Sequence, residues 1–150
     1  MIKELLKGLF EFDQESTLYR GTIQNETPVL YYSYSNMFSG GHYDVSIYSD
    51  GRVVTLGRFC LTTETKRTEN MVSPLQVKDI KNDLRKIGFY SMKNKYAPEG
   101  DIITVFDGYS DSLTLNDIGR SKTVTRNTFS IKEYDRIINK IKELGSVNRF

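Results

Sequence analysis

The chain has 150 residues, of which 38% are hydrophobic and 27% are charged, and its formal net charge is +2. This composition predicts one soluble globular domain with its own core, and it excludes a disordered chain or a strongly basic protein drawn to nucleic acid or anionic lipid. Because Cys60 is the only cysteine, no intrachain disulfide can form. No signal peptide or transmembrane span is expected, so the predicted location is cytoplasmic.

The first twelve residues repeat apolar side chains at helical spacing. Residues 2, 5, 6, 9 and 10 are apolar and share one face, while Lys3, Glu4 and Lys7 lie on the other. We expect a short amphipathic helix over residues 1–12 that packs on its own domain, forms a homodimer contact or lies on a membrane surface. The mixed charges of its polar face argue against the membrane. Residues 13–28 are a polar connecting segment.

Two runs of β-forming residues follow. Residues 29–38 alternate in the manner of a strand, and Ser39-Gly40-Gly41 ends it. Residues 43–57 read as a β-hairpin with Asp50-Gly51 in a two-residue type I′ turn. Such a turn predicts that Ile47 lies opposite Val54 and that Val45 lies opposite Leu56.

The middle of the chain predicts another strand and a well-capped helix. Residues 58–65 read as a strand, with Phe59 and Leu61 on one side, and residues 66–70 as a charged turn. Residues 72–88 carry the signals of a helix. Ser73 is the N-cap, Pro74 is the first helical residue, Gln76 completes a capping box and Gly88 is the stop signal.

The last third repeats this layout. Residues 89–100 are a linking segment, residues 102–106 a short strand, and Asp107-Gly108 a turn. Two strands then place Leu113, Leu115 and Val124 inward, with a turn at residues 117–119. In the final helix, Ser130 is the expected cap and Glu133 completes its capping box. Gly145 ends that helix, and residues 146–150 are a tail.

These elements predict an α+β fold. Antiparallel hairpins form one sheet, and the two capped helices cover one of its faces within a single domain over residues 29–145. A ββα-like order of elements occurs twice, without a repeat at the level of residues. The other face of the sheet is left for solvent or a partner.

Few side chains in the sequence could carry catalysis or bind a metal. His42 is the only histidine, so a Ser-His-Asp or Cys-His arrangement must use it, and the enzyme alternative is a hydrolase that uses His42 with Asp101 or Asp107. Paired carboxylates for glycoside hydrolysis stay open, but the sequence does not single out a pair. Asp101, Asp107, Asp111 and Asp117 could together attract a hard cation, but their spacing does not match a calcium loop. We expect no cofactor, no bound metal and no enzymatic activity.

The aromatic residues favour binding. The chain has ten tyrosines, which bury area while their hydroxyls keep a hydrogen bond. The candidate binding surface is Tyr31, Tyr32, Tyr34, His42 and Tyr48, and the expected partner is a protein. A nucleic acid could stack on such tyrosines beside basic residues, although the balancing acidic residues weigh against it.

The run GGHYDVSIYSDGRVVTLG and the capped helix that ends at Gly88-Phe89-Tyr90 resemble a family of small uncharacterised domains. The family has a Tyr-x-apolar-x-apolar-Tyr-x-Asp-Gly hairpin, a capped helix and a closing helix. The resemblance covers roughly residues 30–145 and implies the fold without an activity. Many members have a Cys-Phe-Gly-x-Cys-Pro segment where this chain has residues 36–41 without cysteine, so no thiol-based role is expected.

A fainter likeness concerns layout alone. Small protein inhibitors of thermolysin-type metalloproteases look similar, with a Gly-Gly entrance, a hairpin, a helix, further strands and a helix. No inhibitory residue can be assigned from this likeness. The function that the sequence predicts is therefore a non-catalytic protein-binding module. The alternatives are an inhibitor-like protein, a metal-dependent hydrolase that uses His42, and a nucleic-acid binder.

Overall fold

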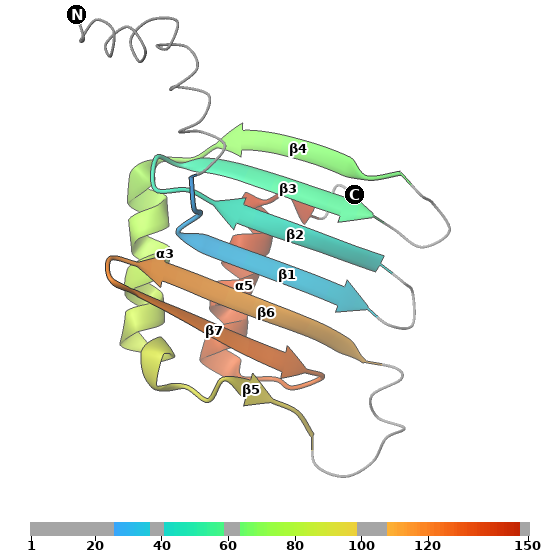
Figure 1. The fold of residues 1–150 in the computed structure, drawn as a ribbon, viewed down its shortest axis with the longest axis vertical. Helices are drawn as coiled ribbons and strands as arrows, with labels where there is room; N and C mark the ends of the chain where they lie inside the picture. The colour runs from blue at the N-terminus through green and yellow to red at the C-terminus, as the bar shows by residue number, and fades with distance from the viewer. Residues whose placement is uncertain (1–25, 37–40, 59–63, 99–107, 148–150) are drawn as a thin grey trace, which may run out of the picture.

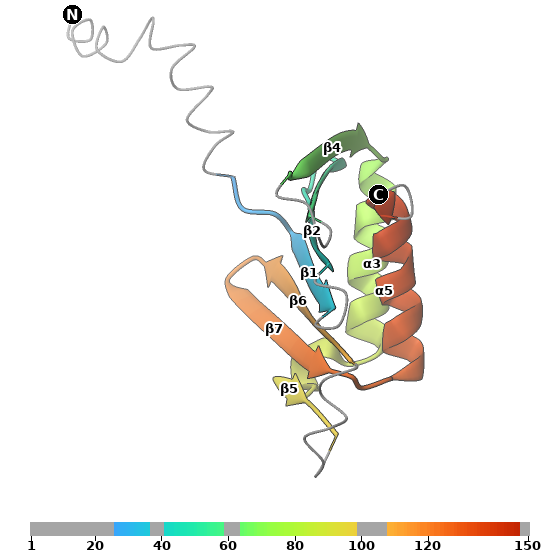
Figure 2. The same cartoon turned by 90° about the vertical axis from the view of Figure 1, so that its right-hand side faces the viewer.

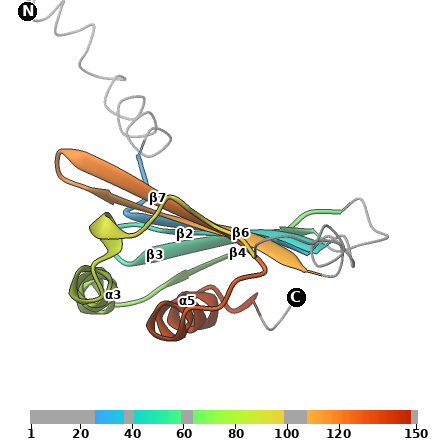
Figure 3. The ribbon, with the colours of Figure 1, turned by 90° about the horizontal axis from the view of Figure 1, so that it is seen from below.

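The computed structural model describes residues 26–36, 41–58, 64–98 and 108–147. These residues form a seven-stranded sheet in the order β4-β3-β2-β1-β6-β7-β5, with two α-helices on the same face (Figures 1, 2 and 3). The predicted α+β class is confirmed. Within the described residues, neither helix is long and apolar enough to cross a membrane. The predicted helix at residues 1–12 and the strand at residues 102–106 lie outside the described residues.

The first four strands form an antiparallel meander, and the chain then crosses to the opposite edge of the sheet. The meander is β1 (Leu30–Asn36), β2 (Gly41–Ile47), β3 (Arg52–Arg58) and β4 (Lys66–Met71). Helix α3 (Pro74–Lys86), a 3-10 turn η1 (Phe89–Ser91) and strand β5 (Lys95–Tyr96) follow. The hairpin β6 (Tyr109–Asp117) and β7 (Arg120–Asn127) precedes α5 (Lys132–Leu144). Strand β5 runs parallel to β7, which is an exception in the otherwise antiparallel sheet.

The core lies between the sheet and the helices. Strand β1 is central because it pairs with β2 on one side and with β6 on the other. Apolar side chains alternate along these strands toward the helices, as a sheet covered on one face requires. The buried apolar residues of the strands are Leu30, Tyr32, Val45, Ile47, Val53, Leu113, Leu115 and Val124. Those of the helices are Val77, Ile80, Leu84, Tyr134, Ile137, Ile138 and Ile141.

The capping signals of the first helix are confirmed. The Ser73 hydroxyl accepts a hydrogen bond from the Gln76 backbone N–H, and the Gln76 side chain accepts one from the Ser73 N–H. Gly88 follows the helix with a φ of +78°, as a C-terminal stop. The predicted Ser130 cap and Glu133 capping box of the last helix are wrong, because no side-chain hydrogen bond from the described residues caps its N-terminus and Glu133 pairs with Arg136. The N-cap of α5 is Ile131, and the Ser130 hydroxyl donates to Asp135 instead.

The predicted hairpin forms, but its register is wrong. The Tyr48 N–H donates to the Arg52 carbonyl, so the turn has three residues between these two rather than two. Gly51 has a φ of +98°, which suits a type I turn closed by a left-handed glycine. The extra residue places Ile47 opposite Val53 and shifts every later pair by one position.

This register decides which side chains of β3 enter the core. Val53 and Thr55 point toward the helices and are buried, whereas Leu56 is 38% exposed. The Thr55 hydroxyl donates to the Gly145 carbonyl, which ties the end of α5 to the sheet. The three-residue turn therefore determines how the last helix packs.

The predicted charged turn at residues 66–70 is wrong, because this segment is the edge strand β4. All six residues of β4 are exposed. One side of β4 pairs with β3, and its other side is an edge of the sheet. Charged residues are common on edge strands because they discourage pairing with another chain. An exposed edge strand needs no alternation of apolar residues, so its pattern resembles that of a turn. Of the strand predicted over residues 58–65, only residues 58, 64 and 65 are described.

We predict that Gly51→Ala lowers the free energy of unfolding by about 2–4 kcal/mol. A Cβ at Gly51 would lie 2.0 Å from the Val72 carbonyl oxygen, and its backbone conformation disfavours alanine as well. Gly119→Ala is the matched control. Gly119 also has a positive φ, but a Cβ there meets nothing within 4 Å, so its cost should stay near 1 kcal/mol. Urea unfolding would measure both, and equal losses would contradict the packing role of Gly51.

Candidate functional site

A pocket of about 370 Å³ lies between the helix-facing side of the sheet and α5. We call it the tyrosine pocket. Strands β1, β6 and β7 and helix α5 contribute its lining, which is Tyr34, Tyr109, Asp111, Arg126, Asp135, Ile138, Asn139 and Lys142. Two smaller pockets, of about 230 and 240 Å³, lie along the two helices, and Lys140 borders both of them. The tyrosine pocket gathers aromatic, acidic and basic groups and is the candidate site.

A row of tyrosines forms one wall. The Tyr34 ring stacks on Tyr43 at 4.9 Å between ring centres and on Tyr109 at 6.0 Å, with interplanar angles of 19° and 15°. Strands β2 and β6 flank β1, so the two neighbours cover opposite faces of the Tyr34 ring. Tyr34 therefore offers a ligand its ring edge and its hydroxyl. That hydroxyl accepts a hydrogen bond from the Asn36 side chain at 3.4 Å.

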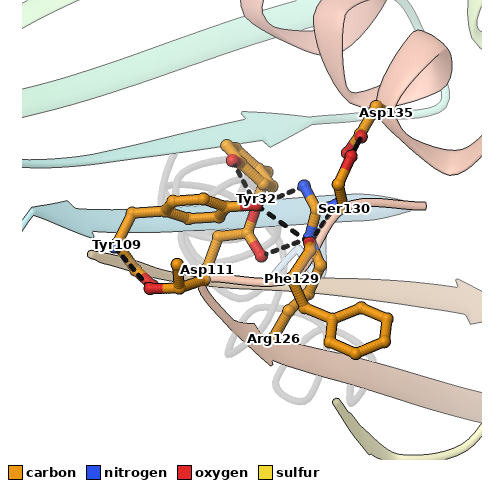
Figure 4. Close-up of polar contacts among 8 residues, drawn as sticks. Tyr32, Tyr109, Asp111, Arg126, Phe129, Ser130 and Asp135 are labelled. Carbon is orange, nitrogen blue, oxygen red and sulfur yellow. Dashed lines mark hydrogen bonds and ion pairs between the residues drawn. The ribbon is translucent and has the colours of Figure 1, made fainter. Parts of the chain in front are cut away.

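A buried ion pair lies beneath the tyrosine row. Asp111 and Arg126 face each other across β6 and β7, and their side chains are 1% and 3% exposed. Arg126 donates through Nε and Nη2 to the two oxygens of Asp111, each at 2.9 Å. The Tyr32 hydroxyl donates to the same carboxylate at 2.8 Å (Figure 4). Such a bidentate pair fixes the positions of both side chains.

The same guanidinium connects the sheet to helix α5. Arg126 Nη1 donates to the Phe129 carbonyl at 3.0 Å and to a carboxylate oxygen of Asp135 (Figure 4). The Ser130 hydroxyl donates to the other oxygen of Asp135 at 2.7 Å. Asp135 lies in the first turn of α5, where the helix dipole also favours a negative charge.

The network holds its members in fixed charge states. Burial by itself would lower the pKa of Arg126, but its hydrogen bonds to Asp111 and Asp135 raise the pKa above its usual value. Burial favours neutral Asp135, yet hydrogen bonds from Ser130 and Arg126 lower the pKa of this carboxyl. Burial and the nearby Asp111 charge raise the pKa of Tyr32.

Lys142 differs from these groups. It lies in the last turn of α5, and its ammonium is 5.2 Å from the centre of the Tyr34 ring. It makes no hydrogen bond or ion pair with another residue of the described part of the chain. Burial lowers the pKa of Lys142, and the Arg126 charge lowers it further, while Asp111 and Asp135 oppose this effect.

The five residues of the predicted binding surface lie in three different parts of the structure. Tyr34 lines the tyrosine pocket, and Tyr32 has no exposed area because it lies in the core. Tyr31, His42 and Tyr48 project from the opposite face of the sheet, since side chains alternate along a strand. The prediction treated Tyr31, Tyr32 and Tyr34 as one patch, and this alternation separates them.

His42 lies in a short polar row on that opposite face. Its Nδ1 is 3.1 Å from the Ser35 hydroxyl, and its Nε2 is 3.3 Å from an oxygen of Asp44. Burial raises the pKa of Tyr31, and the neighbouring Asp44 adds to the effect. A nucleophile, a base and an acid are thus connected. However, β1 and β2 pair on both sides, so their backbone N–H groups are used in the sheet rather than available to an oxyanion.

The aspartates that seemed clustered in the sequence do not form one site. Asp111 and Asp117 are six positions apart on β6, which corresponds to roughly 20 Å along an extended strand. Asp111 binds Arg126, whereas Asp117 pairs with Arg85 and Lys81 near the end of α3. Asp101 and Asp107 lie outside the described residues. Among the described residues, no group of three or more His, Cys, Asp or Glu could hold a metal ion.

The comparison with protein families identifies the chain. Residues 39–145, which include the hairpin, both helices and most of the tyrosine pocket, match the model of a domain of unknown function, DUF6438. The chain belongs to this family. A search of curated proteins found no match. Strand β1 precedes the matched residues, so Tyr32 and Tyr34 come from outside the matched part of this DUF6438 protein.

The sequence analysis missed most of the tyrosine pocket, although one signal for it was present. Asp111 lies two and four positions before the inward residues Leu113 and Leu115, so strand alternation directs it into the core. Arg126 lies two positions after the inward residue Val124, so the same alternation directs it into the core. Opposite charges at inward positions of adjacent strands predict a buried ion pair. Asn139 and Lys142 gave no comparable signal, because polar residues on helices are ordinary.

We predict that Arg126→Met lowers the free energy of unfolding of the DUF6438 protein by about 3–5 kcal/mol, because it leaves the Asp111 charge buried without its partner. Adding Asp111→Asn should recover part of this loss, since the amide is neutral and still accepts from Tyr32. Arg136→Met is the control, as Arg136 is exposed and, among the described residues, pairs with Glu133 alone at the helix surface. Urea unfolding would measure each variant. A double variant as unstable as Arg126→Met alone would contradict the role of the buried charge.

We predict that Asp117→Asn costs about 0.5–1 kcal/mol at neutral pH, and that this cost disappears as the pH falls through 2. Hydrogen bonds from Arg85 and the Ile118 N–H lower the pKa of Asp117 to about 2, from an ordinary 3.8. A lowered pKa in the folded state stabilises the protein above the ordinary value, and this gain is lost as the pH falls through 2. Urea unfolding of the protein and the variant between pH 6 and about pH 1 is the measurement. A difference as large at the lowest pH as at pH 6 would show that the charge of Asp117 is not its cause.

Proposed function

We propose that this DUF6438 protein is a non-catalytic binding module and that the tyrosine pocket is its ligand site. The observation that carries the proposal is the fixed geometry of the pocket. The Asp111–Arg126–Asp135 network holds the floor, and the stacked rings of Tyr34 and Tyr109 hold the wall. A site whose side chains are already in place loses little conformational entropy when a ligand enters.

The charge states support binding over catalysis. A general acid or base must exchange a proton near the working pH. In the network at the floor of the tyrosine pocket, the pKa of Arg126 is raised and that of Asp135 is lowered, so both of these groups stay charged around neutrality. The catalytic alternative with His42 has no free backbone N–H for an oxyanion among the paired residues of β1 and β2.

The size of the pocket supports a small ligand group. Small-molecule sites usually range from about 300 to 1,000 Å³, so a volume of about 370 Å³ accommodates a compact molecule or one side chain of a protein partner. The two pockets along the helices are smaller, and the Lys140–Asp83 ion pair bridges the helices between them.

The partner that we propose is a protein that inserts one side chain or a chain end into the tyrosine pocket. Such a partner approaches the helix-facing side of the sheet near α5. Tyr31, His42 and Tyr48 on the opposite face are then not part of this contact. A variant on that face therefore serves as a control for any variant in the pocket.

The test is a ligand titration of the full chain observed by NMR. The probes are 4-methylphenol, benzoate and benzylammonium, which share one ring and differ in charge. We expect at least one of them to shift signals from the pocket at concentrations up to about 10 mM, the usual range for fragments of this size. Asn139→Phe should abolish the shifts, because Asn139 is an exposed helix residue at the pocket and its replacement fills the space. Tyr48→Ala should leave the shifts intact.

The same titration can overturn the proposal. If no probe shifts the pocket signals, or if the folded Asn139→Phe variant responds as the natural protein does, the tyrosine pocket is not a ligand site.

A further inference from the structure

We infer that the group bound in the tyrosine pocket is an organic carboxylate and that Lys142 is its charged partner. This inference rests on the proposed function, since it assumes that the pocket binds a ligand. It concerns the chemistry of that ligand, which the family match leaves open.

The carboxylate acceptors of the pocket are engaged in hydrogen bonds, whereas the donors of Lys142 are not engaged within the described residues. All four carboxylate oxygens of Asp111 and Asp135 accept hydrogen bonds from Arg126, Tyr32 or Ser130. The three N–H donors of Lys142 have no acceptor among the described side chains and carbonyls. The acidic groups of the pocket are thus already engaged, whereas the Lys142 donors are unused within the described residues, and this contrast favours an anion.

Two neutral groups beside Lys142 add to this preference. The Tyr34 hydroxyl accepts from Asn36, which leaves its own proton available for a ligand. Asn139 lies one turn before Lys142 on the same helix and lines the same pocket. Its amide can donate two hydrogen bonds. An ammonium, a phenol and an amide thus line one pocket, and all three can donate to a carboxylate.

Partial burial of Lys142 strengthens its interaction with a bound carboxylate. An ammonium that has lost part of its hydration gains more from a direct anionic partner than an exposed one does. The charge-assisted hydrogen bond to a carboxylate is also stronger than a neutral one. In contrast, Lys140 two residues away already pairs with Asp83 at 2.9 Å on the helix surface.

The surrounding charges limit the ligand to a single negative charge. Asp111, Asp135 and Arg126 together carry a net charge of −1, which Lys142 balances. A carboxylate adds one charge beside Lys142, while a phosphate dianion would add two and face stronger repulsion from the network. A cationic ligand would be attracted by the acidic groups, but Arg126 and Lys142, which line the same pocket, would repel it.

The experiment compares the three ring probes by charge. In NMR titrations of the full chain at low salt, benzoate should bind at least tenfold tighter than 4-methylphenol or benzylammonium, as expected for one charge-assisted hydrogen bond. Lys142→Met should weaken benzoate about tenfold, to the affinity of 4-methylphenol. Lys140→Met should leave benzoate binding unchanged, and the spectra report directly whether each variant is folded.

The outcomes separate this inference from the function on which it rests. If 4-methylphenol or benzylammonium binds as tightly as benzoate and Asn139→Phe abolishes that binding, the pocket is a ligand site but the carboxylate inference is wrong. The inference also fails if folded Lys142→Met binds benzoate normally. If none of the probes binds, the proposed function itself is wrong.

A further NMR titration with two peptides distinguishes a carboxylate of a protein partner from that of a free small molecule. An acetyl-Ala-Glu-Ala-amide peptide presents one carboxylate on a protein backbone, and the peptide with Gln in place of Glu is its neutral match. Tighter binding of the Glu peptide than of benzoate would assign a protein partner. Tighter binding of benzoate would assign a free small molecule.

Discussion

The buried pair of Asp111 and Arg126 is the interaction on which the rest of the site depends. An ion pair in a core is costly to desolvate, and it is tolerated only where the geometry satisfies both groups. Here the guanidinium also binds Asp135 and the Phe129 carbonyl, so one side chain connects β6, β7 and α5. The position of α5 against the sheet follows, and with it the position of Lys142 beside Tyr34.

The two faces of the sheet have different roles because both helices pack on the same face (Figures 2 and 3). The covered face supplies the core and, where α5 passes over β1 and β6, the tyrosine pocket. The uncovered face carries short polar contacts such as Ser35–His42–Asp44. Strands β1 and β2, which carry these contacts, pair on both sides, so this part of the face presents side chains rather than free backbone donors.

Much of the fold could be predicted from local signals, while the candidate site largely could not. The Ser73–Gln76 capping box and the stop at Gly88 depend on neighbouring residues alone, so α3 was found with its start and its end. The hairpin was found as well, but its register depends on whether the turn has two or three residues, and Asp-Gly is compatible with both. Of the predicted binding residues, only Tyr34 reaches the tyrosine pocket, because the alternation of β1 sends Tyr31 to the other face and the core encloses Tyr32.

The sequence by itself determined the α+β class, the capped helix α3 and the inward stripe of the strands, since hydrophobic periodicity and capping are properties of short segments. Strand alternation likewise directs Asp111 and Arg126 inward, where a charge needs a partner. The pairing of β6 with β7 then brings the two side chains together. Tertiary structure alone decided that Asn139 and Lys142, ordinary residues of a helix surface, lie at a pocket. The packing of α5 across the sheet brings these two residues to the same pocket as Tyr34, and no sequence pattern within the helix indicates this.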